Sequence, residues 1–274
     1  MSPTERLRKP LLGLVCVLTM LQICAAAEAQ ADWEWGHAVH NGLTRERIVG
    51  LIDIPGLDGN ACGPEVPVTI DLYGIPSKAK PPIGVLEYIV IGREPQGGAC
   101  SGVRVALTRA GARAAEVMPV EESGYEIKAV IAYERVGQWF RIALPRGSAW
   151  MMSSKQEHFH PYPTLLKDSL AFMTAGWDGR LWRTPDTSST SAVPSKVKAL
   201  LTRIAAGEKQ GVQMGNVDVD VLAIRRVAGE IWIQVRVTEG HCGDDEKPAT
   251  LGTGWLPAHR PDSKPSVWFS SRGC

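Results

Sequence analysis

The stretch DVLAIRRVAGEIWIQVRV at residues 220–237, followed by GTGWLPAH at residues 252–259, decides the fold of this chain. An earlier stretch, AVIAYERVGQWFRIAL at residues 129–144, is followed by GSAWM at residues 147–151. Both have an apolar strand, a glycine turn, a strand that carries a tryptophan, and a small residue before a last tryptophan. Apolar runs on either side of a short glycine turn are typical of β-hairpins. The duplication therefore predicts two similar β-structured units.

The flanking segments extend this pattern. IVGLIDIPGL at residues 48–57 and GVRVALT at residues 102–108 are β-branched runs that end at glycine, proline or a polar residue, as strands do. LYGIP at residues 72–76 and LWRTP at residues 181–185 form a second matching pair, with leucine, an aromatic residue and proline in register. The sequence predicts an all-β protein with an internal repeat.

The order of these segments predicts the domain organisation. Residues 32–152 form a first domain with a polar lead-in, and residues 170–274 form a second. The polar, proline-interrupted residues 153–169 are predicted to be a linker. Within the second domain, apolar residues at helical spacing between Ser195 and Gly207 predict one short helix. That helix is either a packed connector or a lid over one end of the domain.

Alternation along the repeated strand predicts which side chains form the core. Phe140, Ile142 and Leu144 share one face because successive strand residues point to opposite faces. Trp139 then lies on the other face, and Trp232 is its counterpart in the second repeat. Both tryptophans are predicted to point away from the core.

Residues 1–31 have the features of a secretory signal peptide. A basic end with Arg6, Arg8 and Lys9 precedes a 13-residue apolar run at residues 11–23, and small residues follow. The run is shorter than the roughly 20 apolar residues that a membrane-spanning helix needs. The sequence therefore predicts a protein that is exported, periplasmic or secreted, without a stable membrane anchor after cleavage.

The charge balance restricts the class of partner. Removing residues 1–31 takes away three basic and two acidic side chains from totals of 30 and 29, so the remainder is neutral. Binding to nucleic acid requires a concentrated cationic face, and none is present in the sequence. The prediction is that the protein binds no nucleic acid and is not held to a membrane surface by charge.

Four cysteines remain after removal of the leader, and an oxidising compartment favours their pairing as two disulfides. Three pairings are possible. If each repeat folds separately, each holds one pair, which predicts Cys62 with Cys100 and Cys242 with Cys274. No two of these cysteines form a C-x-x-C pair, so neither a metal site nor a cofactor is predicted.

Several of these motifs resemble bacterial SH3-like (SH3b) domains. TIDLYGIPSKAKPPIGVLEYI at residues 69–89 is similar to the opening of such a domain, in which a strand ends near a proline-serine turn. The Trp-bearing hairpins resemble its closing strands. The resemblance covers residues 65–151 and 176–257 and leaves the terminal WFSSRGC at residues 268–274 outside. It implies two small SH3-like β-barrels in tandem.

The resemblance also implies a binding module of the bacterial cell envelope, directed at peptidoglycan or at an envelope protein. Aromatic side chains exposed beside a turn can form a platform for a sugar ring or a peptide. The alternative is that they only cover the ends of the barrels. The candidate binding residues are Tyr73, Trp139, Trp150, Trp182, Trp232 and Trp255.

No catalytic residues are predicted. The sequence has no G-x-S-x-G elbow, no H-E-x-x-H motif and no phosphate-binding glycine loop. The two β domains use up the chain, which leaves no room for the catalytic domain of an envelope hydrolase. The predicted function is therefore non-catalytic binding. The alternative from a different class is a structural or inhibitory protein partner that binds no glycan.

Overall fold

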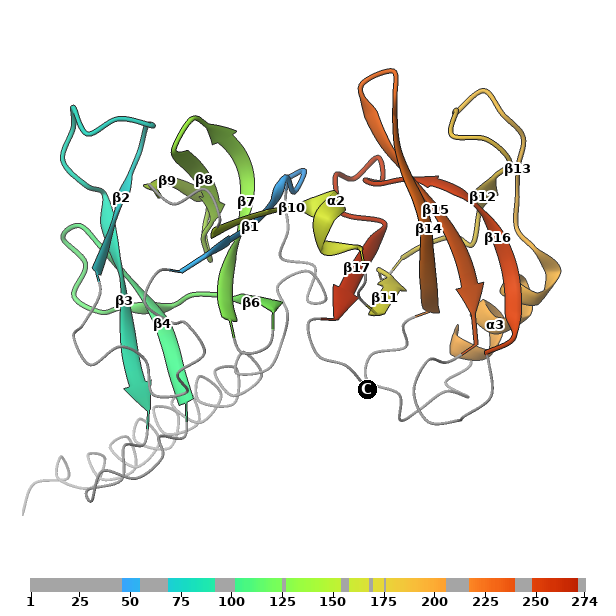
Figure 1. The fold of residues 1–274 in the computed structure, drawn as a ribbon. Coiled ribbons are helices and arrows are strands. Elements are labelled where there is room, and N and C mark those ends of the chain that lie inside the picture. The colour runs from blue at the N-terminus through green and yellow to red at the C-terminus, as the bar shows by residue number, and fades with distance from the viewer. Residues whose placement is uncertain are drawn as a thin grey trace, which may run out of the picture. The chain divides into compact units, whose positions relative to one another are not determined.

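The structure is a computed structural model that describes residues 46–54, 69–91, 102–124, 127–153, 158–167, 170–174, 176–205, 217–239 and 248–270. These residues belong to one compact unit, His37–Cys274. They form two curled antiparallel sheets with little helix, which confirms the predicted all-β, barrel-like class (Figure 1). The predicted leader and the predicted disulfide cysteines lie outside the described residues: 1–31, Cys62, Cys100, Cys242 and Cys274.

The first sheet contains ten strands. They are β1 (Gly50–Asp53), β2 (Thr69–Tyr73), β3 (Gly84–Ile91), β4 (Gly102–Arg109), β5 (Glu116–Val117), β6 (Glu121–Gly124), β7 (Ile127–Val136), β8 (Trp139–Ala143), β9 (Ser148–Met152) and β10 (Phe159–Pro161). The second sheet contains seven strands. They are β11 (Leu170–Met173), β12 (Leu181–Trp182), β13 (Ser191–Ala192), β14 (Val217–Val227), β15 (Glu230–Thr238), β16 (Thr250–Pro257) and β17 (Val267–Ser270).

The two sheets share a common strand order. The first sheet runs β10-β1-β7-β8-β9-β2 before it continues into β3, β4 and β5. The second runs β17-β11-β14-β15-β16-β12 and ends at β13. Each strand of the first series therefore has a counterpart in the second. The strands β4, β5 and β6, which lie between β3 and β7 in the chain, are additional to the first repeat.

Within the predicted linker at residues 153–169, Phe159–Pro161 form strand β10, which lies in the first sheet. β10 pairs with β1 and is the counterpart of β17, which pairs with β11. The chain then enters the one-turn helix α2 (Tyr162–Leu165), which the sequence did not predict and which buries Tyr162. The terminal WFSSRGC segment at residues 268–274, which the SH3b resemblance does not cover, contributes its first three residues to β17.

The pairing of β1 with β10 depends on Gly50. A Cβ atom at this position would lie 2.2 Å from the carbonyl oxygen of His160. We expect Gly50→Ala to lower the free energy of unfolding by about 1–3 kcal/mol, the usual cost of overpacking. Urea denaturation followed by circular dichroism measures this change in the free energy of unfolding. Gly74→Ala is the control, since its Cβ would meet nothing closer than 3.8 Å. Equal stability of the two variants would contradict the close pairing.

The two central hairpins differ in length. Each has a register shift at the equivalent point, after Ala132 in the first and after Val221 in the second. Beyond it, the hairpin β7–β8 closes at the pair Val136 and Trp139. The hairpin β14–β15 continues for two more pairs, which are Arg226 with Ile231 and Val227 with Glu230. Ala228 and Gly229 then make the turn, both with positive φ, as a two-residue hairpin turn requires.

The predicted helix is confirmed as α3 (Ser195–Ala205). Val197 and Leu200 are buried, and Leu201 and Ile204 pack against the core of the second repeat. A Cβ at Gly252 of β16 would lie 2.7 Å from Pro194, so the start of α3 packs closely on that strand. This supports the packed connector over the lid. Neither helix in the described part of the chain is long and apolar enough to cross a bilayer.

Candidate functional site

The structure brings the six candidate aromatic residues together as two equivalent trios. In the first repeat, Tyr73 of β2 is opposite Trp150 of β9 and makes an edge-to-face contact with Trp139 of β8, with ring centroids 5.3 Å apart. In the second repeat, Trp182 of β12 is opposite Trp255 of β16. Its ring contacts Trp232 of β15 edge to face, with centroids 5.9 Å apart.

These trios do not form the predicted exposed platform. Trp232 is only 2% exposed, so the prediction that it faces outward is wrong. Tyr73, Trp150 and Trp255 are also buried, and Trp139 is half-buried. Alternation correctly separated the two faces of the strand, because Phe140, Ile142 and Leu144 are all buried in the core. The second face is covered too, since the neighbouring strands place their own aromatic rings against it.

Electrostatic contacts at the trios are consistent with a packing role. Burial raises the pKa of the Tyr73 hydroxyl, and the nearby Asp71 carboxylate adds to that shift. The Arg225 guanidinium lies over the ring of Trp255 at 5.3 Å from its centroid, which is a cation–π contact. Tyr73 and Trp255 therefore already have polar partners within the protein.

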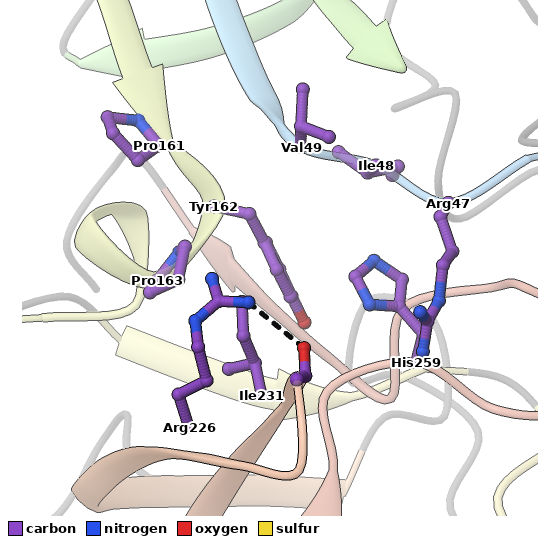
Figure 2. A pocket seen from close by; sticks show the side chains of 10 residues that line it. Arg47, Ile48, Val49, Pro161, Tyr162, Pro163, Arg226, Ile231 and His259 are labelled. Atoms are coloured by element: carbon purple, nitrogen blue, oxygen red, sulfur yellow. Dashed lines mark hydrogen bonds between the residues drawn. The ribbon is translucent and has the colours of Figure 1, made fainter. Parts of the chain in front are cut away.

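A cleft of about 310 Å³ is a better candidate site (Figure 2). Both repeats contribute to its lining. The first contributes Arg47, Ile48, Val49, Pro161, Tyr162 and Pro163. The second contributes Arg226, Gly229, Ile231 and His259.

The extended hairpin β14–β15 builds one wall of this cleft. Arg226 and Ile231 form the first of its two additional pairs, and Gly229 is in its turn. The first repeat has no equivalent of these pairs. The extension that distinguishes the second repeat is therefore the part that lines the cleft.

The opposite wall is held in place by Tyr162. Its hydroxyl donates a hydrogen bond of 2.5 Å to the carbonyl oxygen of Val267 in β17. Its ring lies 5.8 Å from the ring of Trp268 in a stacked arrangement and 5.2 Å from that of His259. Burial raises the pKa of the Tyr162 hydroxyl, which therefore stays protonated. Pro161 and Pro163 on either side of this anchored residue give the wall a restricted backbone.

The cleft carries an excess of positive charge. Arg47 forms an ion pair with Glu230 at 3.2 Å, and Arg226 donates to the carbonyl oxygen of Gly229 at 3.0 Å (Figure 2). Burial and the nearby Arg47 lower the pKa of His259 to about 4, so its imidazole is neutral at pH 7. The guanidinium groups of Arg47 and Arg226 line the cleft and the carboxylate of Glu230 lies beside it, so the site favours an anionic ligand.

A second polar cluster lies at β1, β6 and β10. Asp53 accepts a hydrogen bond of 2.5 Å from the Ser123 hydroxyl, and its other oxygen is 2.8 Å from Nε2 of His160. A nucleophilic serine needs the histidine between the serine and the acid, but here the acid is in the middle. The cluster fits a structural tie between strands. Within the described ranges, no group of three or more potential ligands could hold a metal ion.

The cleft residues carry no local pattern that marks them in the sequence. Arg47, Tyr162 and His259 come from segments that were interpreted as a lead-in, a linker and a strand end. One usable signal was present: RRVAGEI at residues 225–231 is longer than its counterpart in the first repeat. Extra hairpin residues that are not needed for the sheet are a reasonable place to look for a binding role.

The chain matches no protein-family model, no curated protein and no solved structure.

Proposed function

We propose that this protein is an exported, non-catalytic binding module of the bacterial cell envelope, and that it binds peptidoglycan through the cleft. The observation that carries the proposal is the cleft itself, because a hairpin extension unique to the second repeat supplies one of its walls. Pockets with an apolar lining and a few converging polar groups are the usual form of small-ligand sites. The signal-like leader and the SH3b-like motifs in the sequence support the envelope as the location.

The size of the cleft supports peptidoglycan over a folded protein partner. A volume of about 310 Å³ accommodates a short peptide or a sugar residue. A stable interface between two globular proteins instead needs about 800 Å² of surface from each partner. Peptidoglycan offers both sugars and short peptides that can enter a small cleft.

Co-sedimentation tests this function. The protein, exported by a bacterial host and purified from its periplasm, is mixed with purified peptidoglycan sacculi and centrifuged. We expect most of the protein in the pellet. Chitin, which has a related glycan but no peptides, is the control polymer and should leave the protein in the supernatant.

Two results would contradict the proposal. Protein that stays in the supernatant with sacculi is not a peptidoglycan binder, and capture of a specific envelope protein would then favour the structural or inhibitory partner. Release of soluble fragments from the sacculi would contradict the non-catalytic assignment.

A further inference from the structure

The charges around the cleft indicate the chemical class of its ligand. We propose that the cleft binds a carboxylate group at the end of a short apolar peptide, with Arg226 as its principal anchor and Arg47 as a second one. This inference rests on the proposed function, since the stem peptides of peptidoglycan end in free carboxylates.

Arg226 has hydrogen-bonding capacity to spare. It lies on the exposed tip of β14, and one of its nitrogens, Nη1, donates to the Gly229 carbonyl oxygen at 3.0 Å. A guanidinium has five N–H donors, and its planar fork matches the two oxygens of a carboxylate. The remaining donors of Arg226 are thus available at the edge of the cleft.

Arg47 is held less firmly than most paired arginines. Its Nη2 lies 3.2 Å from one oxygen of Glu230, and both side chains are about half exposed, at 55% and 45%. Exposed ion pairs of this type contribute little net free energy, so a ligand carboxylate can compete for this guanidinium. Glu230 also keeps Arg47 close to the cleft before the ligand arrives.

The rest of the lining favours a carboxylate with an apolar neighbour over an isolated inorganic anion. Val49, Pro161, Pro163 and Ile231 are exposed or partly exposed and present aliphatic surface, whereas Ile48 and Tyr162 are almost fully buried. Such surface gains free energy by covering small aliphatic side chains. A peptide terminus made of alanine residues combines a carboxylate with small aliphatic side chains.

The first repeat provides an internal comparison. Arg135 also lies near the tip of its hairpin and donates to a turn carbonyl, that of Gly137, at 3.2 Å. Its guanidinium, however, lies over the rings of Phe140 and Phe159, at 5.5 and 5.2 Å. Among the described residues, Arg226 lies over no aromatic ring. The same residue type is thus used for packing in one repeat and left available in the other.

The test uses acetyl-D-alanyl-D-alanine as the probe, titrated into the protein and followed by NMR through the Arg side-chain and His259 ring signals. The second probe is acetyl-D-alanyl-D-alanine amide, which has nearly the same shape but lacks the negative charge of the carboxylate. We expect the amide to bind at least tenfold more weakly, because hydrogen bonds to a charged group are worth about 1.5–3 kcal/mol. Acetyl-L-alanyl-L-alanine distinguishes a stem-peptide terminus from a protein C-terminus, and tighter binding of the D-form supports the former.

Arg226→Gln is expected to weaken binding of the D-form acid about tenfold, and Arg226→Lys less than that. Arg135→Gln is the matched control and should leave binding unchanged. Equal binding of acid and amide, or an unchanged affinity in Arg226→Gln, would overturn the carboxylate site. If no carboxylate probe binds while sacculi still sediment the protein, this inference is wrong and the proposed function stands. Probe binding without sedimentation overturns the proposed function alone.

Discussion

Trp232→Ala is expected to lower the free energy of unfolding by about 3–5 kcal/mol, the usual cost of removing a buried aromatic side chain. Trp232 is 2% exposed and lies edge to face against Trp182. Its removal leaves a cavity on a face of the sheet that the neighbouring strands already cover, and close-packed surroundings relax only partly into such a space. Urea denaturation followed by far-UV circular dichroism measures the loss.

The first repeat supplies a control for this variant. Trp139 is the counterpart of Trp232 and makes the same type of contact with Tyr73, but it is only half-buried. We therefore expect Trp139→Ala to lose clearly less stability than Trp232→Ala. If Trp232→Ala keeps full stability and loses only its binding to sacculi, Trp232 is a ligand-binding residue and the packing role is wrong.

Acidification from pH 7 to pH 4 is expected to lower the stability of the fold through His259. Burial is the main reason that the pKa of His259 falls to about 4, and the positive charge of Arg47 adds to it. A hydrogen bond to the backbone at Ile48 and the charge of Glu230 oppose the shift and are weaker. The folded protein therefore excludes a proton that the unfolded chain accepts.

The sign of the effect follows from the two pKa values. In the unfolded chain the pKa of His259 is near 6.5, the ordinary value for histidine, and in the folded chain it is about 4. Between these values the unfolded state binds more protons, so stability falls as the pH falls and levels off below about 4. The total loss in the free energy of unfolding is about 3 kcal/mol, since each pKa unit corresponds to about 1.4 kcal/mol.

The variant His259→Phe isolates this contribution. It keeps an aromatic ring beside Tyr162 and cannot be protonated. The loss of unfolding free energy between pH 6.5 and pH 4 should therefore be smaller than in the unchanged protein by most of the roughly 3 kcal/mol attributed to His259. Carboxylates whose pKa values are lowered in the folded state, such as Glu46 beside Arg141, also lose stability on acidification, but they are the same in both proteins. An unchanged pH dependence in His259→Phe would contradict the role of His259.

Local periodicity made most of the secondary structure predictable. Alternation along the strand identified Phe140 and Ile142 as core residues, and both are buried. The helical spacing that begins at Val197 identified α3, whose apolar face packs as predicted. These features depend on residues a few positions apart, so a single sequence contains the information.

Long-range contacts were not predictable in the same way. Strand β10 has no strong alternation of its own, and it forms because β1 offers an edge and Gly50 permits close approach. The cleft was missed for a similar reason. Arg47 and Glu230 are 183 positions apart in the chain, and no local pattern marks them as neighbours.

The repeated hairpin thus specified an all-β chain with two related sheets, because its alternation and its glycine turn act within a few residues. The burial of Trp232, the membership of β10 in the first sheet and the positions of the cleft residues were decided by tertiary packing. Alternation assigns a side chain to one face of a strand, but what covers that face depends on segments distant in the sequence.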